Sequence, residues 1–113
     1  MTAILTDTLP PVDCTPWCQA GDGHTSTTHQ NDQWCFSEAR RIDLGAMPLN
    51  TFNGEPEGRQ TIDAYLAREH NARTATIEVC HNESTAIIYT PAEALEHARH
   101  LTELAMVALA TEV

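Results

Sequence analysis

Residues 61–93 read TIDAYLAREHNARTATIEVCHNESTAIIYTPAE, and this stretch decides the fold. Apolar and polar residues alternate over 61–67 and again over 74–80, which is the period of a half-buried strand. Polar clusters at 70–72 and 82–84 follow these two runs, and a short apolar run ends at Tyr89. This spacing predicts an antiparallel meander.

The end of the same stretch marks the start of a helix. Thr90 can cap it through its hydroxyl, Pro91 has the φ that the first helical position requires, and Glu93 completes a capping box. The apolar periodicity predicts a helix over 90–110 whose apolar face packs on the sheet. That face consists of Leu95, Ala98, Leu101, Thr102, Ala105, Ala108 and Leu109.

The pattern is weaker on the N-terminal side of this stretch. Residues 40–44 are a short strand candidate, and residues 45–58, with several Pro, Asn and Gly, are expected to form a loop or an excursion from the sheet. Residues 1–12 are expected to be a flexible tail, and 13–113 a single small domain. The predicted class is α+β: a zinc-stapled loop over 13–36, an antiparallel sheet of three or four strands within 37–89, and the C-terminal helix.

Five side chains near the N-terminus are competent to bind a metal. Thiolates and imidazoles on a short loop with few aliphatic residues are what a tetrahedral zinc site needs. A loop of this kind has few other means of holding a shape, and the core of so short a chain is small. The five residues are Cys14, Cys18, His24, His29 and Cys35.

The spacing of these residues suggests which four would bind. Cys14 and Cys18 have the separation found in zinc hairpins, and Cys35 lies far enough along the chain to close the loop. The fourth ligand is either His24 or His29. Gly21 and Gly23 favour His24, because they let the backbone fold back toward the two Cys, and Asp22 is then an outer acceptor for the imidazole N–H.

Other chemistry is open to the same thiols. Cys14 and Cys18 could form a disulfide or stay as free thiols, and an all-Cys iron–sulfur cluster would have to recruit Cys80, which we interpret as a strand side chain. Four protein ligands leave no open coordination position, so we expect one structural zinc per chain. A hydrolytic centre would need a general base, and the deaminase-type His-x-Glu signature is absent.

The charge balance limits the partners. The net charge is −10, with six Arg, sixteen acidic residues and no Lys. Such a chain should be repelled by duplex DNA and by anionic membrane surfaces. It has no apolar stretch of about 20 residues for a membrane span and no signal-peptide pattern, so we expect a cytoplasmic protein with reduced thiols.

Four further side chains have two interpretations each. His97 and His100 follow Glu93 and Glu96 at helical spacing; they could form a second metal site, but surface Glu–His pairs explain them more simply. The Trp residues that flank the metal ligands either cover the loop or form a platform for a partner. They are Trp17 and Trp34.

Three motifs carry a family resemblance: Cys14-Thr15-Pro16-Trp17-Cys18 with a following His, then Asp32-Gln33-Trp34-Cys35, and the helix start Thr90-Pro91-Ala92-Glu93-Ala94. They resemble a group of small uncharacterised actinobacterial and actinophage proteins with a Cys-Pro-x-Trp-Cys motif, a His shortly after it and a later Trp-His. The resemblance implies an actinobacterial or phage setting and a zinc-like loop, without an activity. Cys35 stands where those proteins have His, which fits a metal ligand better than a catalytic base.

The leading hypothesis is a non-enzymatic, zinc-stabilised interaction or regulatory module with a protein partner. The apolar arc of the helix, with Leu101, Leu104 and Ala108, could also support a homodimer. One alternative is a nucleic-acid-associated zinc domain, for which Arg40 and Arg41 are the only adjacent basic pair. Another is a thiol-redox or hydrolytic zinc enzyme, and the thiol-redox role would require reactive, exposed cysteines.

Overall fold

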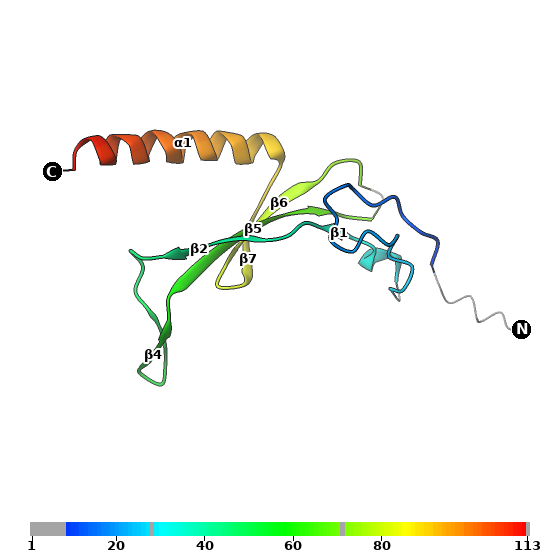
Figure 1. The fold of residues 1–113 in the computed structure, drawn as a ribbon, viewed down its shortest axis with the longest axis horizontal. Helices are drawn as coiled ribbons and strands as arrows, with labels where there is room; N and C mark the ends of the chain where they lie inside the picture. The colour runs from blue at the N-terminus through cyan, green and yellow to red at the C-terminus, as the bar shows by residue number, and fades with distance from the viewer. Residues whose placement is uncertain (1–8, 28, 71, 113) are drawn as a thin grey trace, which may run out of the picture.

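The computed structural model describes residues 9–27, 29–70 and 72–112 (Figure 1). Most of the predicted N-terminal tail, residues 1–8, lies outside this part. Strands and a C-terminal helix follow one another as predicted for an α+β fold. The elements are η2 (Gln30–Asp32), β1 (Cys35–Phe36), β2 (Arg40–Leu44), β3 (Asn50–Phe52), β4 (Glu55–Gly58), β5 (Gln60–Arg68), β6 (Thr76–His81), β7 (Ser84–Tyr89) and α1 (Pro91–Ala110).

The main sheet is antiparallel and is built around the long strand β5. Strand β6 pairs with one edge of β5, and β7 pairs with β6, which confirms the predicted meander. The other edge of β5 is shared by β1 and β2, which lie end to end along it. The sheet therefore has five strands rather than three or four, because the end of the expected metal loop, Cys35–Phe36, also pairs with β5.

The segment 45–58 is an excursion that contains a hairpin of its own. Strands β3 and β4 pair antiparallel and form a second, two-stranded sheet. Between them, Asn53 and Gly54 have φ values of 53° and 83°. Asn-Gly is the favoured pair for a two-residue hairpin turn, because both positions need a positive φ. This dipeptide is the sequence signal that identifies the hairpin.

The two faces of the main sheet differ in chemistry. On one face the register places Ile42 opposite Ile62, and further aliphatic side chains of β6 and β7 continue it. On the other face the Arg41 guanidinium donates to both carboxylate oxygens of Asp63, at 2.6 and 2.8 Å. The strand alternation predicted from the sequence thus separates an aliphatic face from a polar one.

The interior of the protein is small. Among the described residues, the hydrophobic side chains that are buried are those of Cys35, Ala67 and Cys80. Large aliphatic side chains remain exposed on both the sheet and the helix. Burial of aliphatic surface is the main stabilising contribution in most domains. Because little of it occurs here, we expect a further interaction to stabilise this fold.

The helix begins as predicted. The Thr90 hydroxyl accepts the backbone N–H of Glu93 at 3.2 Å, and the Glu93 carboxylate accepts the backbone N–H of Thr90 at 2.8 Å, which is a complete capping box. α1 contacts β6 and β7. Apart from Ala94, however, its residues remain exposed, so the sheet covers only the first part of the predicted apolar face. Within the described residues, no helix combines the length and the apolarity that a bilayer span requires.

Candidate metal centre

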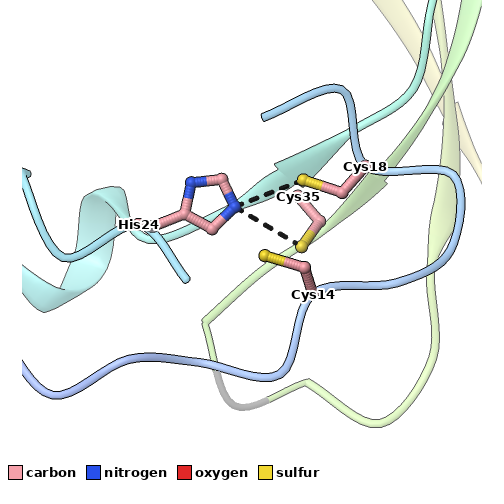
Figure 2. Close-up of side chains that lie close together, drawn as sticks. All are labelled: Cys14, Cys18, His24 and Cys35. Carbon is pink, nitrogen blue, oxygen red and sulfur yellow. Dashed lines mark hydrogen bonds between the residues drawn. The ribbon is translucent and has the colours of Figure 1, made fainter. Parts of the chain in front are cut away.

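Three thiols and one imidazole converge beside the first strand (Figure 2). Cys14 and Cys18 come from the loop that precedes the strands, His24 from the same loop, and Cys35 from the start of β1. Their four ligand atoms all lie within 4.8 Å of one another. Residues separated by up to 21 positions in the sequence thus form one cluster, the Cys3His cluster.

The backbone of the loop turns twice to bring these groups together. The N–H of Cys18 donates to the carbonyl of Thr15 at 3.1 Å, which closes a turn between the first two Cys. Gly21 and Gly23 then adopt φ values of 62° and 78°. A Cβ at position 23 would lie 2.9 Å from Cβ of Pro11, so only glycine fits this crossing. The proposed role of the two glycines in folding the loop back is confirmed.

The imidazole of His24 points its Nε2 atom at the sulfurs. Nε2 lies 3.3 Å from Sγ of Cys18 and 3.6 Å from Sγ of Cys35. In a tetrahedral zinc site, bonds of about 2.3 Å to sulfur and about 2.0–2.1 Å to nitrogen place a nitrogen and a sulfur roughly 3.6 Å apart. The observed separations therefore fit a zinc ion between these atoms. His24 also holds a φ of 56°, a value uncommon for a residue with a Cβ.

Asp22 supports the histidine differently from the expectation. Its carboxylate accepts the backbone N–H of His24 at 3.0 Å. The Nδ1 atom of the ring lies 3.8 Å from the same carboxylate oxygen, which is beyond hydrogen-bond distance. Asp22 therefore fixes the backbone of His24 rather than the orientation of its ring.

Gln33 is the residue of this centre that sequence patterns do not reveal. Its side chain is only 1% exposed. The amide Nε2 donates to the carbonyl of Pro10 at 2.9 Å and to the carbonyl of His24 at 3.1 Å, and so ties the entering chain to the histidine segment. A single Gln has no diagnostic spacing. Its position two residues before Cys35 was the only hint available.

The thiols are in electrostatically different environments. Burial raises the pKa of Cys14, and the nearby thiols raise it further, although the backbone N–H of Gly23 opposes this by donating to its sulfur at 3.3 Å. Burial also raises the pKa of Cys18, but hydrogen bonds from the backbone N–H of Gly21, from Cys35 and from His24 outweigh it and lower the pKa to about 6. A thiolate stabilised by N–H donors is a ready metal ligand.

The remaining candidates lie outside the cluster. His29 is exposed and precedes η2, so the structure brings His24, and not His29, to the three thiols. Cys80 is buried in β6, where its sulfur faces Tyr65, in agreement with its interpretation as a strand side chain.

His97 contacts Tyr89 of β7 instead of pairing with a Glu. Trp34 is half-buried and stacks on Phe36, with ring centroids 5.8 Å apart.

Comparison with known proteins assigns the chain to one family. A family model described as "Domain of unknown function (DUF6907)" matches residues 1–111. The chain belongs to the DUF6907 family. The DUF6907 match contains the whole Cys3His cluster and all of the described helices and strands. None of the curated proteins and none of the solved structures compared with the chain shows a significant match.

Proposed function

We propose that this DUF6907 domain is a zinc-stabilised, non-enzymatic protein-interaction module. The observation that carries the proposal is the convergence of four ligand atoms, from Cys14, Cys18, His24 and Cys35, within 4.8 Å. Three thiolates and one imidazole fill a tetrahedral shell. No position is then left for water or substrate, so the zinc would be structural.

The small interior supports a structural role for the metal. Buried hydrophobic side chains in the described part are limited to two Cys and one Ala. Zinc binding to structural sites contributes about 10–16 kcal/mol of apparent free energy, which acts as folding free energy where the apo chain is unfolded. One zinc would thus fix the N-terminal loop against the edge of β5, where aliphatic burial does not.

An aromatic surface next to the cluster suits a protein partner. Trp34 and Phe36 stack with nearly parallel rings and, with Asn31 and Asp32, line a shallow hollow of about 280 Å³. Aromatic side chains are the commonest anchors of protein interfaces. With a net charge of −10, the surrounding surface favours a basic partner.

The ion pairs of two of the six arginines argue against the nucleic-acid alternative. Arg41 is held by Asp63 and by Glu83, and Arg99 is held by Glu103. These cations are already neutralised within the protein, so they release few counterions from phosphates. We therefore expect no salt-dependent affinity for random duplex DNA. An electrophoretic titration at low salt tests this, because a charge-driven complex would be detected under that condition.

Reduced thiols are a condition of the proposal. We therefore place the protein in the cytoplasm, where thiolates remain available to a metal. The resemblance to small actinobacterial and actinophage proteins supports a host or phage setting.

Elemental analysis of protein purified without chelator tests the metal directly. We expect one zinc per chain, and a Co²⁺-substituted sample should show the absorption bands of a tetrahedral thiolate site. Cys14→Ser should abolish both signals, whereas the matched variant Cys80→Ser, which alters a buried thiol outside the cluster, should retain them. Absence of metal from the wild-type protein would contradict the proposal.

A thiol-redox role has one supporting observation, the lowered pKa of Cys18. The rate of alkylation separates the two functions. Zinc-bound thiolates should resist iodoacetamide until a chelator is added, whereas a redox thiol of low pKa should react at once. Rapid alkylation of Cys18 in metal-replete protein would support the redox enzyme instead.

A further inference from the structure

The helix α1 and the sheet below it enclose a groove that the chain leaves open. The groove has a volume of about 360 Å³ and an almost entirely apolar lining. Its floor is the aliphatic face of the sheet, including Ile42, Ile62 and Ile87, and its wall is the first half of α1. The wall combines the small residues Ala94 and Ala98 with His97 and Leu101, and the helix leaves the space between them and the floor open.

Both sides of this groove remain exposed. Ile42 is 62% exposed on the floor, and Leu101 is 54% exposed on the wall. Beyond Leu101 the helix carries Leu104 and Leu109, which are also exposed. Figure 1 shows α1 joined to β7 at its N-terminal end and running past the strands toward the C-terminus. A 20-residue helix is about 30 Å long, and Ala94, in its first turn, is the one residue of α1 that is not exposed.

We infer that the occupant of this groove is the helix of a second copy of the same chain. One copy offers an aliphatic sheet face without a full cover and an apolar helix without a full partner. In a two-fold dimer, α1 of each copy would lie on the groove floor of the other copy. Both sheet faces and both helix faces are then covered, because an isologous interface uses the same surfaces of each subunit twice. A heterologous partner would have to supply both patches separately.

The available apolar area approaches what a stable dimer needs. A large aliphatic side chain offers on the order of 100 Å² of apolar surface. Weighted by their exposed fractions, the aliphatic side chains of the groove and of α1 offer several hundred Å² per copy. A standard interface takes about 800 Å² from each partner, of which about 65% is apolar in homodimers, or roughly 500 Å². The contributing residues are Ile42, Ile87, Leu95, Leu101, Leu104 and Leu109.

The charges permit this pairing although the chain as a whole is acidic. Helix α1 carries three Glu and one Arg, so it holds only −2 of the net charge of −10. At helical spacing, Glu96, Arg99 and Glu103 lie on the side opposite to Ala98 and Leu101. Two such helices can therefore meet along their apolar sides with their charged sides in solvent.

The proposed dimer uses a different surface from the proposed zinc site. One of these two hypotheses can therefore be wrong while the other is right. The test is the mass of the purified, zinc-replete full chain by light scattering coupled to gel filtration, at micromolar concentration. We expect twice the 12.4 kDa of the chain. A monomer would overturn the inference and leave the groove to a different protein.

Two matched pairs of variants locate the interface. Leu101→Glu should give a monomer, whereas Val107→Glu should remain a dimer, because Val107 is similarly exposed at 64% but follows Glu103 on the charged side of α1. Ile42→Glu should also give a monomer, whereas Phe52→Glu should not, because Phe52 is 63% exposed on the separate β3–β4 hairpin.

Circular dichroism and zinc content keep these outcomes interpretable. Each variant should retain the helical signal and one zinc, so that a change in mass reports the interface and not unfolding. A dimer that persists in both Leu101→Glu and Ile42→Glu overturns the assignment to this groove. So does a monomer that appears equally in Val107→Glu or Phe52→Glu.

Discussion

The Nε2 atom of His24 lies 3.3 Å from Sγ of Cys18, although neither residue belongs to a helix or a strand. Only loop geometry brings them together, with positive φ values at Gly21, Gly23 and His24 itself. A loop held in uncommon backbone conformations needs a compensating interaction. A bound zinc would provide one, since it would tie this loop to Cys35 at the edge of the sheet.

His24→Ala should therefore release the metal. One of four ligands is lost, and we expect zinc affinity to fall by more than the tenfold to hundredfold that follows removal of an outer-shell partner. Competition with a chromogenic chelator measures this. His29→Ala is the matched control, because His29 lies in the same loop region but outside the cluster. Equal losses in the two variants would show that the site uses both histidines or neither.

Cys14→Ser should destabilise the fold far more than Cys80→Ser. The first variant removes a proposed metal ligand from a domain with a small interior. The second should cost about 1 kcal/mol, which corresponds to a decrease in melting temperature of roughly 4–8 °C for a domain of this size. Thermal melts of zinc-replete samples compare them. If the melting temperature falls equally in both variants, Cys80 contributes as much to stability as a residue of the cluster.

Local signals were the most predictable from the sequence. The capping box of Thr90 and Glu93 depends on residues three positions apart, and the structure contains both of its hydrogen bonds. The alternation within 61–67 depends on neighbours in one strand, and β5 covers it. The Cys3His cluster could also be predicted, because few arrangements of three thiols and an imidazole in a short loop serve another purpose.

Surfaces that depend on a partner could not be predicted in the same way. Periodicity shows that α1 has an apolar face, but it does not show what covers that face. The sheet covers it near Ala94, whereas Leu104 remains exposed. Gln33 was missed for a related reason: its function comes from two backbone carbonyls, of Pro10 and His24, that the fold brings to it.

Gln33→Ala should weaken metal binding without removing a ligand. The buried amide holds the carbonyl of His24 at 3.1 Å, so its loss frees the segment that positions the imidazole. We expect a tenfold to hundredfold loss of zinc affinity, the range typical for residues that orient ligands. The control is Gln19→Ala, an exposed glutamine between Cys18 and the glycine turn. An unchanged affinity in Gln33→Ala would show that zinc alone orders the loop.

The last prediction concerns acid stability and the pair formed by Arg41 and Asp63. The two hydrogen bonds from Arg41 lower the pKa of the Asp63 carboxyl below its ordinary value, although partial burial opposes them. Because the folded-state pKa is the lower one, this pair stabilises the fold fully above the unfolded pKa of about 3.9. The contribution disappears as the pH falls through the folded-state pKa.

Asp63→Asn should therefore be less stable than the wild type at pH 7, and the difference should shrink as the pH falls below about 4. Acid also protonates metal ligands, so the measured quantity is the difference between variant and wild type, by urea unfolding at each pH. Asp43→Asn, at an exposed position on β2, is the control and should show little difference at any pH. A difference between Asp63→Asn and wild type that stays constant from pH 7 to pH 3 would contradict the ion-pair explanation, because a loss of packing alone does not titrate.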